Sequence, residues 1–353
     1  MSLASGYDLV VFDLDGVVYL GTEPVPRAAA AIRAVVAGGT PVAYVTNNAS
    51  RRAADVADLL EGLGVPATAT DVVTSAQAAA ELLAADLPAG APVLPVGAPA
   101  LRAELEAVGL TTVDTAAARP LAVVQGYGPE VGWPALAEAC VAVRSGARWV
   151  ATNTDATMPS PRGPLPGNGA LVAALSTALG GRAPDTVVGK PEPTLFRVAA
   201  EQRHAPRSLV VGDRLDTDIE GAGRAGLDSL LVLTGVSTPA DLLAAPAHQR
   251  PTYVAGDCAA LAAEDDVRIP LWESDRAVAG RWRVSVDGGR LVLAGPAGST
   301  DGVAGLRALA AAAWANPEWT GVRGDGEAAE RTLDDLGLAG WSVTGAFGAS
   351  TGR

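Results

Sequence analysis

The chain has 353 residues, of which 49% are hydrophobic and 4% aromatic, and its formal net charge at pH 7 is −13. This length predicts two or three domains with their own apolar cores, and the negative charge disfavours nucleic acid or an anionic membrane as the main partner. No apolar run reaches the roughly 18 residues of a membrane helix, and residues 1–8 lack the basic and apolar segments of a signal peptide.

Short apolar runs alternate with helical patterns from the start of the chain. Strands are expected at residues 9–13 and 41–46, and helices at 26–37 and 51–63. The alternation returns after a long middle section, with expected strands at 186–188, 208–211, 228–233 and 252–254 and a helix at 193–203. Buried runs alternating with helices predict an α/β fold with a doubly wound, Rossmann-like parallel sheet.

The middle of the chain, residues 80–183, has an α/β pattern of its own. Strands are expected at residues 93–96, 122–124 and 149–152, and helices at 99–108, 134–144 and 169–179. We interpret this region as a second domain inserted into the first. The first domain is then built from residues 1–79 and 184–263.

The pattern changes again after residue 263. Five of the seven tryptophans follow: Trp272, Trp282, Trp314, Trp319 and Trp341. Runs at 281–286 and 290–293 flank Asp287-Gly288-Gly289, which predicts a β-hairpin, and helices are expected at 303–315 and 326–336. Residues 264–353 are therefore predicted to form a small α+β unit whose tryptophans pack in its core or against a neighbour.

Polar residues follow the predicted strands of the first domain where each strand ends. Asp13 and Asp15 follow the first run, Thr46 ends the second, Lys190 follows the third and Asp213 follows the fourth. In open α/β sheets, ligands bind outside the carboxyl ends of the strands. One site could therefore hold all of these side chains.

The residue types at this predicted site favour phosphate chemistry. Asp13, Asp15 and Asp213 would repel one another unless a hard cation such as Mg²⁺ lay between them. Thr46 and Lys190 could hold the remaining phosphate oxygens. One carboxylate could then attack phosphorus to form an aspartyl phosphate, while another serves as general acid and base.

Four segments resemble the motifs of the haloacid dehalogenase superfamily of phosphohydrolases. They are VFDLDGV (11–17), VTNN (45–48), GKP (189–191) and VGDRLDTDI (211–219). The insertion, with WVATNTD (149–155) and PGNG (166–169) before a helix, resembles the large α/β cap of the p-nitrophenylphosphatase-like group. The resemblance covers residues 7–257.

The resemblance implies a role for each matching residue. Asp13 is implied to be the nucleophile and a metal ligand, and Asp213 a metal ligand through its side chain. Asp15 is implied to be the general acid and base, with its backbone carbonyl on the metal. The implied phosphate-binding residues are Thr46, Asn47, Asn48 and Lys190. Asp218 is implied to support the site, whereas Asp216 is expected to be a solvated charge.

The resemblance also suggests a substrate class. The p-nitrophenylphosphatase-like group includes phosphatases of UMP, pyridoxal phosphate, phosphoglycolate and glycerol phosphate. The third unit resembles the C-terminal domain, similar to GNAT acetyltransferases, of actinobacterial glycerol-3-phosphate phosphatases. That similarity implies glycerol 3-phosphate, with the other esters as alternatives and the cap loop 153–167 choosing among them. Gly128 stands where many relatives carry Asp, so cap specificity does not transfer directly.

Other functions stay open at this point. A phosphotransferase or mutase could use the same scaffold. A bifunctional acyltransferase would need an acetyl-CoA turn, for which Arg323-Gly324-Asp325-Gly326 is the only candidate. The turn Gly167-Asn168-Gly169 fits a cap turn better than a phosphate cradle. His204 and His248 neighbour no motif, which disfavours a histidine nucleophile or a His-ligated zinc ion.

The expected partner is therefore a small phosphorylated metabolite, with no nucleic acid or membrane involved. The two cysteines, Cys140 and Cys258, form neither a disulfide framework nor a metal-ligand cluster. A reducing cytoplasm is the expected location. The sequence leaves a homo-oligomeric state open.

Overall fold

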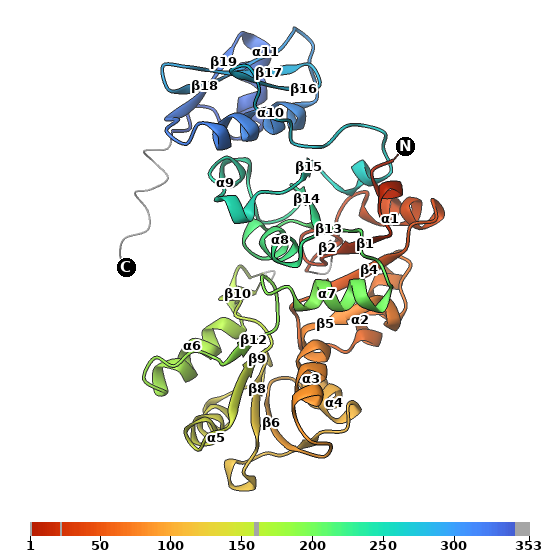
Figure 1. The fold of residues 1–353 in the computed structure, drawn as a ribbon, viewed down its shortest axis with the longest axis vertical. Coiled ribbons are helices and arrows are strands. Elements are labelled where there is room, and N and C mark those ends of the chain that lie inside the picture. The colour runs from red at the N-terminus through yellow and green to blue at the C-terminus, as the bar shows by residue number, and fades with distance from the viewer. Residues whose placement is uncertain (1, 22, 159–161, 343–353) are drawn as a thin grey trace.

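The computed structural model describes residues 2–21, 23–158 and 162–342. Residues 343–353 of the predicted C-terminal unit and 159–161 of the predicted cap loop lie outside the described residues. Three larger sheets follow one another along the long axis of the molecule, with the cap at one end and the C-terminal unit at the other (Figure 1).

The central sheet has six parallel strands in the order β15-β14-β13-β1-β4-β5. The strands are β1 (Leu9–Phe12), β4 (Val42–Thr46), β5 (Val72–Thr74), β13 (Ser208–Gly212), β14 (Asp228–Val232) and β15 (Tyr253–Ala255). β1 lies inside the sheet, where its four buried apolar side chains can pack on both faces. The predicted doubly wound parallel sheet is confirmed, and the three-residue edge strand β5 is an addition to it.

Helices cover both faces of the central sheet. On one face, α1 (Ala28–Ala37) and α2 (Ala53–Gly62) pack with alternate residues of β1. On the other, α3 (Ser75–Asp86), α7 (Thr194–Gln202) and α8 (Glu220–Ala225) pack with the remaining residues of that strand. The alternation of side chains along each strand therefore gives the domain two apolar layers.

The cap contains a five-stranded parallel sheet in the order β12-β9-β8-β6-β7. Its strands are β6 (Pro92–Val96), β7 (Thr111–Thr112), β8 (Ala122–Gln125), β9 (Arg148–Ala151) and β12 (Thr186–Val187). Its helices are α4 (Pro99–Ala107), α5 (Trp133–Arg144) and α6 (Asn168–Ala178). A short hairpin of β10 (Thr157–Met158) and β11 (Leu165–Pro166) extends from the cap towards the central sheet (Figure 1).

The assignment of residues 186–188 to the first domain's sheet is wrong. β12 pairs in parallel with β9, with Thr186 opposite Val150 and Val187 opposite Ala151. A two-residue run carries no pattern that identifies its partner, and parallel partners are distant in sequence. Lys190 therefore enters the site from the segment that returns from the cap. The four domain ranges proposed from the sequence stay a prediction.

The C-terminal unit has a four-stranded sheet in the order β16-β17-β18-β19. The strands are β16 (Arg276–Ala279), β17 (Trp282–Asp287), β18 (Arg290–Ala294) and β19 (Gly321–Asp325), and the helices are α10 (Gly302–Ala315) and α11 (Glu327–Asp335). The predicted hairpin is confirmed as β17 and β18. Trp282 and Trp319 are buried, as the expected packing role of the tryptophans requires.

The C-terminal unit and the central domain share an apolar core. Residues of α10 pack with Leu242 and Leu243 of α9 (Pro239–Leu243) in one cluster of buried side chains. Trp314 donates from Nε1 to the Leu242 carbonyl at 3.0 Å, and buried Arg307 donates to the Val254 carbonyl at 3.0 Å. The unit is thus joined to the domain by packing and by hydrogen bonds.

None of the helices in the described part of the chain is long and apolar enough to cross a membrane.

Removing residues after Ala263 should lower the melting temperature and the solubility, because it uncovers the apolar side chains of α9 and the end of β15. Truncated protein that still folds should keep its turnover, since the strand ends that line the cavity described below all precede this point. Differential scanning calorimetry and steady-state kinetics measure the two effects. A truncated protein that is well folded yet inactive would contradict this division of roles.

A point substitution gives a milder version of the same comparison. Trp314→Ala should cost roughly 2 kcal/mol of unfolding free energy. Trp133→Ala is the matched control, because Trp133 is 80% exposed on the cap.

Candidate active site

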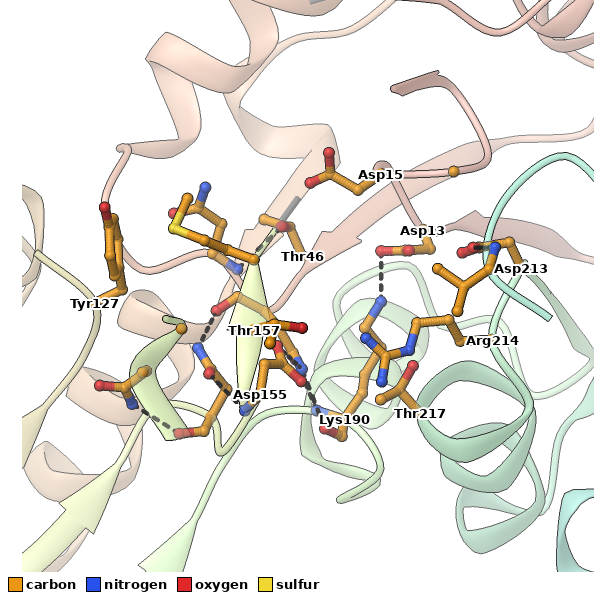
Figure 2. Close-up of a pocket in the computed structure, with 18 of the residues that line it drawn as sticks. Asp13, Asp15, Thr46, Tyr127, Asp155, Thr157, Lys190, Asp213, Arg214 and Thr217 are labelled. Atoms are coloured by element: carbon orange, nitrogen blue, oxygen red, sulfur yellow. Dashed lines mark hydrogen bonds and ion pairs between the residues drawn. The ribbon is translucent and has the colours of Figure 1, made fainter. Parts of the chain in front are cut away.

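A cavity of about 370 Å³ lies between the carboxyl ends of the central strands and the cap (Figure 2). It is lined by all seven residues that the sequence predicts for the site: Asp13, Asp15, Thr46, Asn47, Asn48, Lys190 and Asp213. The structure thus brings together side chains from four separate segments. Their individual roles stay predictions, which the contacts below constrain.

A buried ion-pair cluster occupies the floor of the cavity. Lys190 Nζ donates to Asp13 Oδ1 at 2.5 Å and to Asp218 Oδ1 at 2.7 Å, and all three side chains are nearly inaccessible. Burial would lower the pKa of Lys190, but the two carboxylates raise it above its ordinary value. Burial raises the pKa of Asp13, and Lys190 opposes that rise. The net effect of burial leaves the pKa of Asp13 well above its usual range, while the ion pair with Lys190 fixes the Asp13 carboxyl group in place.

Asp213 has the features of a cation ligand. It is fully buried at the end of β13, and Oδ2 accepts from the Val236 N–H at 2.7 Å. Its other oxygen, Oδ1, is buried without a hydrogen-bond partner among the described residues. Burial raises the pKa of Asp213 to about 7, and the negative charge of the nearby Asp218 adds to this rise. A cation at Oδ1 would satisfy this oxygen and relieve the unfavourable burial of the charge.

Carboxylate oxygens of Asp13, Asp213 and Asp218 all lie within 4.8 Å of one another. This group offers only oxygen donors, which suits a hard ion such as Mg²⁺ better than zinc or a softer metal. Asp218 is already engaged by Lys190 and by the Arg214 N–H. Asp13 and Asp213 are therefore the side chains best placed to bind the cation, and Asp218 holds Lys190.

Glycines allow the chain to close around Asp213. Gly16 has φ +86°, and a Cβ atom there would lie 2.4 Å from Asp213 Oδ2. A Cβ atom at Gly235 would lie 2.0 Å from the same oxygen. The glycine of the first motif thus provides both a left-handed turn and the space for the carboxylate.

Asp15 lies apart from this cluster. Its side chain lines the cavity but points away from Asp13 and Asp213 (Figure 2). Burial raises its pKa, with Lys190 and Arg51 opposing the rise. A carboxyl group with a raised pKa holds its proton more readily, which suits a general acid.

The turn at 46–48 is held by its own side chains. Thr46 Oγ1 accepts from the Asn48 N–H at 3.1 Å, and Asn48 Oδ1 accepts from the Ser50 N–H at 2.8 Å. The Asn47 amide accepts from the Lys190 N–H at 2.8 Å and donates to the Lys190 carbonyl at 3.1 Å. The Asn47 side chain therefore positions Lys190, and the phosphate-binding role of Asn47 stays a prediction.

Sequence reasoning did not name the individual side chains that surround the seven predicted site residues. The cavity is also lined by Arg51, Tyr127, Asp155, Thr157, Arg214 and Thr217. Arg214, Thr217 and Asp155 lie within quoted motifs, and Thr157 lies in the cap loop 153–167 that was expected to choose the substrate. Tyr127 lies in neither. Asp216, expected to be a solvated charge, is exposed but pairs with Arg214 at 2.7 Å.

The segment Arg323-Gly324-Asp325-Gly326, which the sequence offered as an acetyl-CoA turn, does not form such a site in the structure. Gly324 lies in β19, where a Cβ atom would lie 2.7 Å from the Glu330 nitrogen. The first turn of α11 carries Glu327 and Glu330, whose charge opposes a pyrophosphate. The N-terminus of α10 is capped by the Asp301 carboxylate, which accepts from the Ala304 N–H at 3.0 Å. These residues do not fit acetyl-CoA.

Three protein-family profiles match parts of the chain. The profile of haloacid dehalogenase-like hydrolases matches residues 10–111, and a HAD-hydrolase-like profile matches 187–261. The profile of a GCN5-related N-acetyltransferase like domain matches residues 279–338.

Individual relatives are similar over different lengths. D-glycerol 3-phosphate phosphatase of Mycobacterium tuberculosis is 45% identical over 89% of this chain and 87% of its own length. A crystal structure of glycerol phosphate phosphatase from that organism, in complex with magnesium, is 44% identical with a TM-score of 0.87, covering 96% of this chain and 99% of that one. An acid sugar phosphatase of Staphylococcus saprophyticus is 38% identical over 67% of this chain and 90% of its own.

Gly16→Ala should abolish most activity and weaken magnesium dependence, because the new methyl group must displace the Asp213 carboxylate. Gly39→Ala is the matched control: Gly39 has φ +88°, and a Cβ atom there meets nothing within 4 Å. Both variants carry the same backbone strain of about 1 kcal/mol. Titration of activity with Mg²⁺ separates them, and equal behaviour of the two variants would contradict the packing argument.

Proposed function

The chain belongs to the haloacid dehalogenase-like hydrolases, and we propose from this premise that it hydrolyses glycerol 3-phosphate to glycerol and phosphate. The reaction class, magnesium-dependent hydrolysis of a small phosphate monoester, follows from the family and from the carboxylate and lysine cluster of the cavity. The identity of the substrate is a further inference, and it rests on how much of the chain resembles a glycerol phosphate phosphatase.

The observation that supports glycerol 3-phosphate is similarity along almost the whole chain. The mycobacterial glycerol phosphate phosphatase structure covers 96% of this chain, including the C-terminal unit. The acid sugar phosphatase covers 67%. Phosphatases of pyridoxal phosphate, phosphoglycolate and nucleoside monophosphates are the alternatives. A cavity of about 370 Å³ suits a small ester.

Asp13 carries the covalent step in the proposed mechanism. A carboxylate oxygen of Asp13 bonds to phosphorus as the ester P–O bond breaks, and Asp15 gives its proton to the departing alcohol oxygen. Asp15 then takes a proton from water as the water oxygen attacks phosphorus. The bond to Asp13 breaks, phosphate leaves, and both carboxyl groups return to their starting states.

Lys190 and the cation site neutralise the phosphoryl group. Lys190 is oriented by Asp218 and by Asn47, so its charge faces the reacting oxygens beside Asp13. Magnesium would be held by the Asp13 and Asp213 side chains and the Asp15 carbonyl, where its charge stabilises the phosphoryl oxygens. A phosphotransferase would use the same residues but pass the group to an acceptor other than water, so release of free phosphate distinguishes the two.

The proposed partner is a small phosphorylated metabolite in the cytoplasm. A net charge of −13 opposes nucleic acid as substrate. The two cysteines are both unpaired, which suits a reducing compartment.

Asp13→Asn should abolish turnover while the protein stays folded, because an amide is a poor nucleophile and a weaker cation ligand. Asp15→Asn should lower kcat by about 10²- to 10⁴-fold. Phosphate release and circular dichroism measure the two properties. Near-normal turnover by folded Asp13→Asn protein would refute the nucleophile assignment.

A panel of phosphate esters should give glycerol 3-phosphate the highest kcat/KM. Dialysis against EDTA should remove the activity and Mg²⁺ should restore it, since the cation site is built from carboxylates alone. The panel also includes pyridoxal phosphate, phosphoglycolate and UMP. A higher kcat/KM for any of these would overturn the substrate and leave the reaction class intact.

A further inference from the structure

Asp155 is a carboxylate that the cap contributes to the active-site cavity. Four carboxylates line this cavity in the described part of the chain, and the other three, Asp13, Asp15 and Asp213, follow strands of the central sheet. We propose that Asp155 determines specificity: it accepts a hydrogen bond from a hydroxyl group of the ester and repels esters that carry a carboxylate. The inference rests on the proposed function and names the residue that recognises its alcohol part.

The backbone around Asp155 is held on several sides. Its N–H donates to Asn153 Oδ1 at 3.2 Å, and its carbonyl accepts from the Gly169 N–H at 2.8 Å. A Cβ atom at Gly167 would lie 2.4 Å from that carbonyl, and one at Gly169 would lie 2.2 Å from the Thr154 carbonyl. The glycines at 167 and 169 thus form a cap turn against which the loop packs. Such support fixes a side chain well enough to select a substrate.

The Asp155 side chain is also fixed relative to the phosphate end of the cavity. Its Oδ2 accepts from Asn47 Nδ2 at 3.1 Å, and the Asn47 amide in turn binds both backbone groups of Lys190. In Figure 2, Asp155 lies beside Lys190, on the side of the cavity that the cap forms. Asp155 Oδ1 has no hydrogen bond to any described residue, so it can accept one from the substrate.

The charges around Asp155 explain why the site should prefer an ester with a hydroxyl group to one with a carboxylate. Three cationic side chains line the described part of the cavity: Lys190, Arg214 and Arg51. Lys190 pairs with Asp13 and Asp218, and Arg214 pairs with Asp216. Lys190 and Arg214 thus already have acidic partners of their own. Burial raises the pKa of Asp155, while its hydrogen bond from Asn47 and the nearby Arg214 and Lys190 oppose the rise. Its carboxylate form only accepts hydrogen bonds, so that form favours a ligand that offers a hydroxyl donor. The carboxylate of Asp155 also repels a carboxylate on the ester. Like-charge repulsion of this kind lets a site reject a ligand of similar size.

A purely structural role for Asp155 makes a different prediction. If the carboxylate served only to hold Asn47, and through it Lys190, its loss would impair phosphoryl transfer from every ester by the same factor. Recognition of a hydroxyl group would instead change the ranking of esters.

The test compares wild type with Asp155→Asn on three esters. Glycerol 3-phosphate carries hydroxyl groups, phosphoglycolate carries a carboxylate, and p-nitrophenyl phosphate carries neither. The asparagine keeps an oxygen that can accept from Asn47 but removes the charge. We expect kcat/KM to fall by about 10- to 100-fold for glycerol 3-phosphate, to change little for p-nitrophenyl phosphate, and to rise for phosphoglycolate.

Asp114→Asn is the matched control, because it also removes one charge from the cap, at an exposed residue outside the cavity lining. It should leave the ratios among the three esters unchanged. Equal changes for all three esters in Asp155→Asn, or the same altered ratios in both variants, would overturn the inference. The wild-type ranking alone tests the proposed substrate, so the failure of one proposal can be told from failure of the other.

Discussion

The buried ion pair between Lys190 and the two carboxylates Asp13 and Asp218 is the interaction on which the site depends. Three charged groups with almost no exposure to water are stable together only because each is paired and hydrogen-bonded. The arrangement fixes the Asp13 side chain at the buried edge of the sheet and places the positive charge of Lys190 beside it. Loss of either carboxylate partner would leave the ammonium group with an uncompensated cost of burial.

The rest of the fold can be understood as support for this cluster. The parallel sheet delivers Asp13 and Asp213 side by side, because β1 and β13 are neighbouring strands in register. The cap returns the chain at Lys190, and Asn47 ties that segment to the turn after β4. The cap is therefore connected to the chemistry through hydrogen bonds as well as through the shape of the cavity. In the described part of the chain, no residue of the C-terminal unit lines the cavity, and the unit instead extends the apolar core beyond β15.

Much of this site could be predicted from the sequence. Asp13, Asp15, Thr46 and Asp213 each follow an apolar run, and the edge of a parallel sheet brings such positions together. The sheet partner of Thr186 and Val187 could not be predicted, because two residues have no periodicity. The contact between Asn47 and Asp155 was equally hidden, since it joins residues from different domains and depends on how the cap docks. The pairing of Asp216 with Arg214 was missed because exposure alone does not exclude an ion pair.

The most direct test of the account is detection of the phosphorylated aspartate. With p-nitrophenyl phosphate, whose leaving group departs without a proton from Asp15, Asp15→Asn protein should form the intermediate but hydrolyse it slowly, because the group that activates water is gone. The protein would be mixed with p-nitrophenyl phosphate and Mg²⁺, quenched in acid, digested and analysed by mass spectrometry. The account predicts one added phosphoryl group on Asp13, absent from an Asp13→Asn/Asp15→Asn double variant. Release of phosphate in a single turnover without any modified peptide, or modification at another residue, would contradict it.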